Sequence, residues 1–252
     1  MLFPRFAEPS NAESMPADSR IIRAHRMVAH RVFVTGGTGY IGRRLIPALI
    51  AAGHAVTALV RPGSESRLPA GSVPVVGDAL DARSFAGKVP PADTFVQLVG
   101  VAHPGPTKAA QFESVDYASA AASAQAADDA GIRHFIYVSV AQPAPAMAAY
   151  VAARARGEAR IREKGLDATI LRPWYVLGPG HRWPYLVLHA YWIAERIPSM
   201  RETALRCGFV TLPQMVAALV RAVEAPARGV RIVEVPEIRS ASPRIPPLTE
   251  ET

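Results

Sequence analysis

The sequence predicts an α/β fold in which helices cover both faces of a doubly wound parallel sheet, with a small C-terminal region attached. Two observations support this prediction. Short valine-rich segments alternate with longer amphipathic or alanine-rich segments along most of the chain, and this alternation is typical of α/β proteins. The short segments are apolar on both faces, as expected of parallel strands that helices cover.

The first short segment runs directly into a glycine-rich turn. Residues 32–42 read VFVTGGTGYIG, and apolar residues then recur at helical spacing as far as Gly53, so the order is strand, turn, helix. In such a turn Gly36 permits the tight bend, Gly39 lets a pyrophosphate approach the backbone, and Gly42 lets the helix pack on the strand. The helix N-terminus then offers free N–H groups to the anion. A glycine-rich hairpin, the alternative, explains neither flank. The predicted cradle comprises Thr35, Gly36, Gly39, Tyr40, Ile41 and Gly42.

The remaining elements follow in order. Strands are expected at 55–60, 73–76, 95–99, 133–139, 168–171 and 230–235, and helices at 109–130, 146–164 and 213–224. From residue 172 onward prolines interrupt the alternation and aromatic residues cluster. We therefore predict a single domain over residues 31–236, in which 172–236 contributes the substrate pocket. Residues 1–30 are expected to form a disordered leader, with Met27 as an alternative start, and residues 237–252 a loose tail.

Composition excludes several classes of function. Half of the 252 residues are hydrophobic and 19% are charged, which is ordinary for a soluble globular protein. Cys207 is the single cysteine, so neither an intrachain disulfide nor a thiolate metal site is expected. Nothing resembles a secretory signal, and the expected location is the cytoplasm.

The net charge of +7 does not point to nucleic acid. Much of the excess falls on residues 154–164, where arginine and glutamate interleave and Glu158 precedes Arg162 by one helical turn, so we expect a solvated helix face. The apolar stretch 183–194 is too short to span a bilayer. Packing inside the protein is favoured for it over an interfacial membrane helix.

Five segments resemble the short-chain dehydrogenase/reductase superfamily, in its extended and atypical branches. These branches include sugar-nucleotide epimerases and NAD(P)H-binding reductases. The segments are TGGTGYIG at 35–42, GDALD at 77–81, FIYVS at 135–139, Tyr150, and LRPWYVLGPG at 171–180. The resemblance implies a Rossmann fold, a nicotinamide cofactor and a site at the carboxyl ends of the strands.

The end of the second predicted strand indicates which cofactor binds. An acid at this position binds the ribose 2′-OH of NAD, whereas an arginine accommodates the 2′-phosphate of NADP. The residue here is Arg61, and no acid lies between Gly42 and Arg61. NADP is therefore favoured, with NAD as second choice. The alternative is that Arg61 merely caps a strand in solvent.

The resemblance extends the cofactor site beyond the glycine turn. Asp78 resembles the family residue that contacts the adenine amine, although an Asx turn would also explain it. The loop 98–104 lies where the family passes a backbone of small residues beside the cofactor, and Gly100 and Ala102 keep it close. Pro173 resembles the position that packs near the nicotinamide amide. The further cofactor contacts implied are Ala79, Val99, Gly100, Val101 and Pro173.

For catalysis the resemblance implies a tyrosine that exchanges a proton with the substrate oxygen. A free tyrosine has a pKa near 10 and needs a neighbouring cation to work at neutral pH. Tyr150 matches the tyrosine, and Ser139 matches the serine that hydrogen-bonds the reacting oxygen. Arg154 stands where the family has lysine, and a planar guanidinium is not equivalent to an ammonium. The alternatives are a partly buried aromatic ring for Tyr150 and a solvated arginine for Arg154.

These residues together favour an NADP-dependent oxidoreductase that transfers hydride between the cofactor and a small carbonyl or alcohol substrate. The expected partner is a small molecule rather than nucleic acid or a membrane, and no metal is expected. One alternative is a protein that binds NADP(H) without turnover, as a sensor, scaffold or accessory subunit. Another is a sugar-nucleotide epimerase or dehydratase, against which the missing lysine and the small C-terminal region count. The residues expected to border the substrate are His103, Trp174, Tyr175 and His181.

Overall fold

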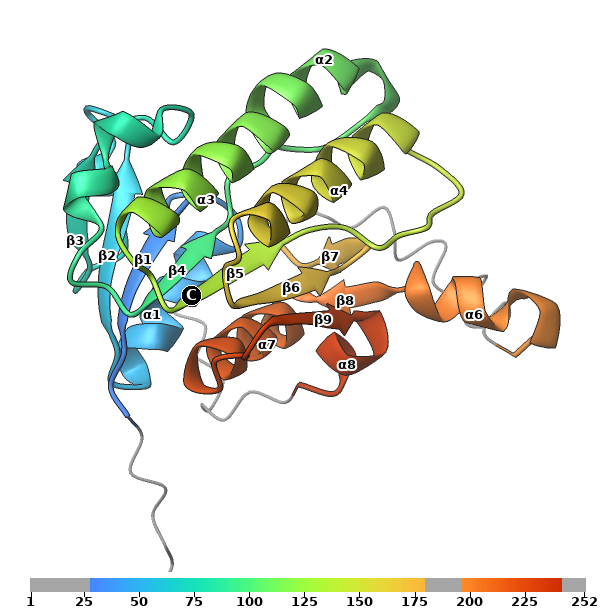
Figure 1. The fold of residues 1–252 in the computed structure, drawn as a ribbon. Coiled ribbons are helices and arrows are strands. Elements are labelled where there is room, and N and C mark those ends of the chain that lie inside the picture. The colour runs from blue at the N-terminus through green and yellow to red at the C-terminus, as the bar shows by residue number, and fades with distance from the viewer. Residues whose placement is uncertain (1–27, 180–195, 242–252) are drawn as a thin grey trace, which may run out of the picture.

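The computed structural model describes residues 28–179 and 196–241. The predicted leader up to residue 27, the tail from 242, and the segment that holds His181 and residues 183–194 lie outside the described residues. A parallel sheet has seven strands in the order β3-β2-β1-β4-β5-β6-β9, and helices cover both of its faces (Figure 1). This arrangement confirms the predicted doubly wound fold. The strands are β1 (Arg31–Thr35), β2 (Ala55–Val60), β3 (Val73–Val76), β4 (Thr94–Gln97), β5 (His134–Val138), β6 (Ala168–Arg172), β7 (Tyr175–Leu177), β8 (Phe209–Thr211) and β9 (Val230–Glu234).

The helices pack on the sheet in two layers. Helix α1 (Gly42–Ala51) and helix α7 (Leu212–Glu224) bury leucine, isoleucine and valine side chains against one face. Helix α3 (Ala118–Asp129) and helix α4 (Ala148–Glu163) cover the other face, where phenylalanines of β1, β4 and β5 line the core (Figure 1). Because successive side chains of a strand point to opposite faces, each central strand contributes to both cores.

Of the strands predicted to be buried on both faces, the edge strand β3 departs from the prediction. Val73 of β3 is 59% exposed and Val76 is 38% exposed, and the first two residues of β9 are also exposed. An edge strand has a neighbour on one side only, and less of it is covered. The prediction was wrong for β3 and right for β4, in which all four residues are buried.

The helix expected over 109–130 is not uniform. It begins with a short turn at Pro106–Lys108 and helix α2 (Ala109–Gln111), and continues as a π-helix, η5 (Phe112–Tyr117), before α3. Wider π turns of this kind occur mostly inside longer helices and often near functional sites. Here the wide turn buries Phe112 and Asp116 together.

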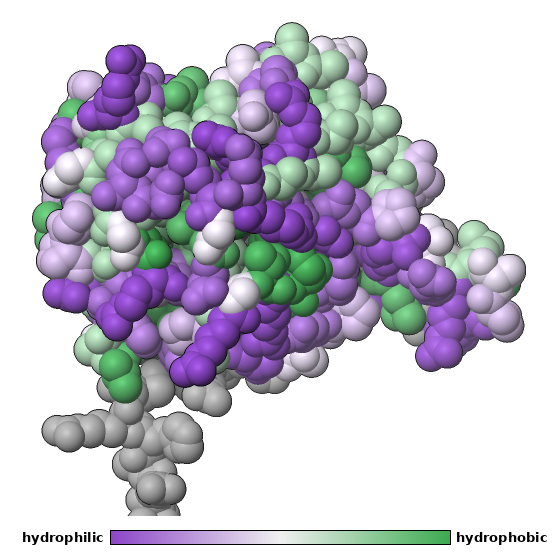
Figure 2. All heavy atoms as spheres, viewed as in Figure 1, coloured by the Kyte–Doolittle hydropathy of each residue, from purple (hydrophilic) through white to green (hydrophobic). Residues whose placement is uncertain are grey.

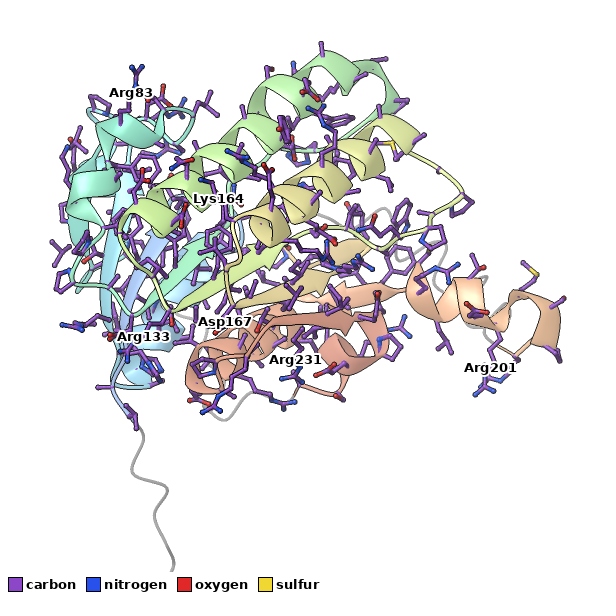
Figure 3. The ribbon with its side chains drawn as sticks, viewed as in Figure 1. Arg83, Arg133, Lys164, Asp167, Arg201 and Arg231 are labelled. Atoms are coloured by element: carbon purple, nitrogen blue, oxygen red, sulfur yellow. The ribbon has the colours of Figure 1, made fainter. Side chains whose placement is uncertain are left out.

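The C-terminal part differs from the expectation in extent. The fold continues past Pro236 as helix α8 (Val235–Arg239), and Ile238 and Ala241 are buried in the same core as α7, so residues 237–241 are not loose. Helix α6 (Pro198–Arg206) projects away from the sheet (Figure 1) and carries Arg201 far from the strands (Figure 3). Strands β7 and β8 pair separately from the main sheet. The face shown in Figure 2 is largely hydrophilic with smaller apolar groups between.

A buried histidine gives the fold a predicted pH dependence. His134 is 1% exposed, and its Nε2 lies 2.9 Å from the hydroxyl oxygen of Thr169. Burial lowers the pKa of His134 to about 4, and the carboxylate of Asp167 offsets only part of this effect. The folded protein thus binds fewer protons than the unfolded chain between about pH 6.5 and that value, so stability falls as pH falls through this window.

We expect the free energy of unfolding to drop by about 3 kcal/mol across this window because of His134 alone. Urea unfolding at a series of pH values, with the wild type and His134→Gln, measures it. The substitution removes the titrating group and should make the curve less steep by the contribution of His134. His103→Gln, at an exposed loop position, should leave the curve unchanged. Equal pH dependence in the wild type and His134→Gln would contradict the prediction.

Candidate nicotinamide-dinucleotide site

The glycine turn lies where the strand order reverses, between β1 and β4. Gly36 has a φ of +76°, and the amide of Gly39 donates to its carbonyl oxygen at 3.0 Å. A Cβ atom on Gly42 would lie 2.4 Å from that same carbonyl oxygen, so no larger residue fits. Ligands of doubly wound sheets bind in the crevice at such a reversal, beyond the carboxyl ends of the strands.

Helix α1 starts at this crevice with its first turn open to an anion. No side chain caps the helix, and its first turn holds no acidic residue. The turn exposes Gly39, and the hydroxyl of Tyr40 packs so closely on Gly178 that a Cβ there would lie 2.2 Å from it. The positive end of the helix dipole, with no acidic side chain beside it, suits a phosphate. The residues present therefore fit the pyrophosphate of a dinucleotide.

Two predicted cofactor residues lie on the β2–β3 side of the turn. Arg61 directly follows β2 and is exposed. Asp78 follows β3, and its Oδ1 accepts a hydrogen bond from the amide of Leu80 at 2.9 Å. This is the Asx turn that the sequence analysis gave as the alternative to an adenine contact, and it uses one carboxylate oxygen of Asp78. Ala79 packs partly buried against the core on the α3 side of the sheet.

On the α3 and α4 face, the apolar core gives way to polar side chains where the strands end. Gln97, Tyr137 and Ser139 are each at most 2% exposed at the ends of β4 and β5. The helices supply polar groups opposite them. Gln97 Nε2, for example, donates to the hydroxyl of Ser119 at 2.9 Å. We call this set the buried polar layer, and its members are Gln97, Asp116, Ser119, Tyr137, Ser139, Arg154, Glu158 and Arg172.

Arg154 is at the centre of the buried polar layer. Its Nη1 donates to the carbonyl oxygen of Val138 at 2.7 Å, and its Nη2 lies 2.6 Å from Oδ1 of Asp116. Arg154 is 5% exposed, so the alternative that it is a solvated arginine on the helix surface is wrong. Burial acts to lower the pKa of Arg154, but Tyr150, Tyr137 and Asp116 outweigh it and raise that pKa above its ordinary value. The guanidinium is a permanent buried cation.

Ser139 and Glu158 form a second centre in the layer. The Ser139 hydroxyl donates to Glu158 Oε1 at 2.7 Å, and Arg172 binds the same carboxylate through Nε at 2.9 Å and Nη2 at 2.6 Å. Glu158 is 1% exposed, which corrects its expected place on a solvated face. Because a hydroxyl has one proton to donate, Ser139 as placed can only accept from a ligand. Its predicted hydrogen bond to the reacting oxygen stays a prediction.

Tyr150 is on the first turn of α4, three residues after Met147, whose φ of 60° is left-handed. Its ring is partly buried against Phe112, with 5.0 Å between ring centroids. The guanidinium carbon of Arg154, one helical turn along, lies 5.3 Å from the centroid of the Tyr150 ring. The structure thus brings Tyr150 and Arg154 together beside the end of β5.

The loop after β4 runs between this centre and the glycine turn. A Cβ on Gly100 would lie 2.0 Å from Nη2 of Arg154, so the guanidinium occupies the space that this glycine leaves. The amide of Val101 donates to Asp116 Oδ2 at 3.1 Å, and the carbonyl of Val99 accepts from Gln97 Nε2 at 3.3 Å. The loop is therefore attached to the buried polar layer at three successive residues.

The predicted substrate residues His103, Trp174 and Tyr175, and the predicted cofactor contact Pro173, lie in the segments that follow β4 and β6. His103 is exposed with a φ of 50°, and its carbonyl accepts from Lys108 Nζ at 3.0 Å. Pro173 is buried, and its carbonyl accepts from the amide of Ala141 at 3.0 Å. Trp174 and Tyr175 are partly buried, and the ring of Tyr175 meets that of Phe209 edge-on at 5.9 Å. His181 lies outside the described residues.

Sequence reasoning missed Asp116, Glu158 and Arg172 as parts of the site. The positions 150, 154 and 158 are spaced four apart, which places them on one helix face, and this spacing is the signal that could have found Glu158. Within residues 28–179 and 196–241, no group of three or more metal-ligating side chains gathers. Among the same residues, no helix has the length and apolar character needed to cross a bilayer.

The open helix terminus at the sheet reversal, the glycine turn and the strand order define a Rossmann-type dinucleotide-binding protein of the short-chain dehydrogenase/reductase class. The chain belongs to the NAD(P)H-binding family, which matches residues 36–183. It is 29% identical over 213 residues to a ceramide reductase of Caulobacter vibrioides. The match covers 82% of this chain and 65% of that relative's length. It is 31% identical over 228 residues to a 3-diazoavenalumate denitrifying reductase of a Streptomyces species, covering 79% of this chain and 74% of the relative.

Solved structures show the same fold at lower identity. The Bordetella bronchiseptica enzyme WbmH in complex with NAD+ superposes with a TM-score of 0.61 at 18% identity, covering 83% of this chain and 79% of that one. A UDP-galactose 4-epimerase superposes with a TM-score of 0.58 at 20% identity, covering 81% of this chain and 77% of that one. These structures therefore show that the chain shares their Rossmann-type fold.

Proposed function

We propose that the protein is an NADP(H)-dependent oxidoreductase acting on the carbonyl or alcohol group of a small organic substrate. The observation that carries the proposal is Tyr150 stacked on the buried cation Arg154 beside the carboxyl end of β5. Tyr150 holds the proton that a carbonyl oxygen needs when it becomes an alcohol. Two relatives that are named reductases support the reaction class.

The chain's own residues divide the work of such a reaction. The glycine turn and the N-terminus of α1 would hold the pyrophosphate, and the bound cofactor supplies the hydride. Tyr150 donates its hydroxyl proton to the substrate oxygen, and the fixed charge of Arg154 stabilises the phenolate that this leaves. Arg154 does not exchange a proton itself, because a guanidinium stays protonated in proteins. Ser139 accepts a hydrogen bond from a donor at the reacting centre, since its own proton is held by Glu158.

A second candidate function, cofactor binding without turnover, is favoured by the engagement of Ser139 and Arg154 in internal contacts. The experiment that separates the two is NADPH oxidation by purified protein with a panel of aldehydes and ketones, followed by absorbance. Turnover with any member of the panel supports the oxidoreductase. Tight NADPH binding with no turnover across the panel would favour the second candidate.

The choice of NADP depends on Arg61, which a direct measurement tests. An arginine can hold a phosphate with two parallel hydrogen bonds. We expect Arg61→Glu to reduce the preference for NADPH over NADH by about tenfold or more, because the acid repels the 2′-phosphate and suits a ribose hydroxyl. Fluorescence titration with both cofactors gives the ratio of dissociation constants.

The matched control is Arg83→Glu, which makes the same change of charge at a side chain that is 92% exposed (Figure 3). It should leave the ratio unchanged. An unaltered ratio in Arg61→Glu would remove Arg61 from the cofactor site, and an equal shift in both variants would point to net charge instead.

A further inference from the structure

Asp116 is a fully buried carboxylate that serves two other segments of the chain. Its Oδ1 pairs with Arg154 Nη2 at 2.6 Å, and its Oδ2 accepts from the amide of Val101 at 3.1 Å. The exposed fraction of its side chain is 0%. A carboxylate so placed persists only when it is paired and hydrogen-bonded. Asp116 therefore connects η5 both to helix α4 and to the loop after β4.

The space around Arg154 shows why the position of its side chain depends on Gly100, Val138 and Asp116 together. Nη2 of Arg154 occupies the place that a side chain at position 100 would take, because a Cβ there would lie 2.0 Å away. Nη1 is held by the carbonyl of Val138. An arginine fits at this helix position because Gly100 leaves room and Asp116 supplies the opposite charge.

The two segments joined by Asp116 lie on one half of the expected cofactor site. In a doubly wound sheet the first mononucleotide-binding half comprises the strands β1, β2 and β3, and the second half lies beyond the reversal. The loop after β4 and the start of α4 belong to the second half, on the side of β5 and Tyr150. Arg61 and Asp78 belong to the first half, whereas Val101 and Arg154, the two polar partners of Asp116, belong to the second.

We propose that Asp116 is a positioning residue for the nicotinamide half of the cofactor, and this rests on the proposed function. It acts through the Arg154 guanidinium and the Val101 amide, and it sets the spacing between the loop after β4 and Tyr150. The adenosine half of the site does not depend on it. The wall of the nicotinamide pocket is thus one unit made of Gly100, Asp116 and Arg154.

The test compares a whole cofactor with a fragment that lacks nicotinamide. In Asp116→Asn, which keeps the shape of the side chain and removes its charge, we expect the dissociation constant of NADPH to rise about tenfold or more. The dissociation constant of 2′-phospho-ADP-ribose should stay at the wild-type value. Both are measured by calorimetric titration of the intact protein, with the melting temperature recorded in parallel.

Further variants separate positioning from general damage. Asp128→Asn, on α3, removes a carboxylate that pairs with Lys164 at the surface, and it should bind both ligands as the wild type does. Gly100→Ala would place a Cβ 2.0 Å from Nη2 of Arg154 and 2.9 Å from Oδ1 of Asp116, so it disturbs this ion pair while keeping both charges, and it should reproduce the selective loss of NADPH. Asp116→Asn combined with Arg154→Gln removes both buried charges; its melting temperature should recover while the selective loss persists.

Two outcomes would overturn the inference. One is unchanged NADPH binding in Asp116→Asn, and the other is an equal loss of both ligands, which would mean that Asp116 supports the whole fold rather than one half of the site. A wild-type protein that binds neither ligand would instead overturn the proposed function. The failure of one proposal is thereby distinguishable from the failure of the other.

Discussion

Gly42→Ala is expected to lower the free energy of unfolding by about 3 kcal/mol and to abolish dinucleotide binding. The added Cβ would lie 2.4 Å from the carbonyl oxygen of Gly36 and 2.7 Å from the Cα of Gly37. Both atoms belong to the backbone, so neither can move aside without opening the turn between β1 and α1. Urea unfolding and NADPH titration measure the two effects.

Two other glycines serve as comparisons. Gly39→Ala meets only the Gly36 carbonyl oxygen, at 3.1 Å, so we expect the stability to stay close to that of the wild type while cofactor affinity falls, because the new methyl group occupies the pyrophosphate face. A Cβ on Gly87 meets nothing within 4 Å, and Gly87→Ala should change neither quantity. A stable Gly42→Ala protein with normal affinity would contradict the packing argument.

Tyr150→Phe is expected to reduce turnover at least about a hundredfold, because it removes the proposed proton donor. The phenylalanine keeps the ring contacts with Phe112 and Arg154, so NADPH binding and melting temperature should stay unchanged. The measurement is the turnover number and the Michaelis constant for a carbonyl substrate that the wild type reduces. A fall in turnover at unchanged NADPH affinity is the signature of a lost chemical role.

Tyr117→Phe is the matched control, because the Tyr117 ring stacks on Arg156 at 3.9 Å on the outer side of the helix pair. It should retain full activity. Equal turnover in the wild type and Tyr150→Phe would remove Tyr150 from the mechanism and leave the buried cation without a catalytic partner.

The fold and the phosphate cradle could be predicted because their signals are local. The strand, turn and helix around Gly36 and Gly42 follow one another within a few residues, and the alternation of elements needs no knowledge of distant contacts. The elements that were predicted less well are an edge strand and a π turn, whose sequences resemble those of a central strand and a regular helix. The exposed edge strand β3 resembles a central strand in sequence, and the π turn of η5 is hidden in an alanine-rich segment that otherwise indicates a regular helix.

The candidate site was predicted in part. The family resemblance singled out Tyr150 and Arg154 as candidates, but it did not predict the surroundings of Arg154. Charged residues of both signs interleave along α4, so its sequence favours a solvated face. Arg154 and Glu158 point inward because Asp116 of η5 and Arg172 at the end of β6 supply the opposite charges.

By itself, then, the sequence determined that this chain forms a doubly wound sheet with a glycine-rich turn between its first strand and first helix, since both depend on short-range periodicity and on glycine geometry. The tertiary structure alone decided the state of the residues beyond the cradle. It placed Arg154 as a buried cation beneath Tyr150, and it directed the proton of Ser139 to Glu158. The physical reason is that burial makes a charge depend on its partners, and these partners come from strands and helices that meet only when the chain has folded.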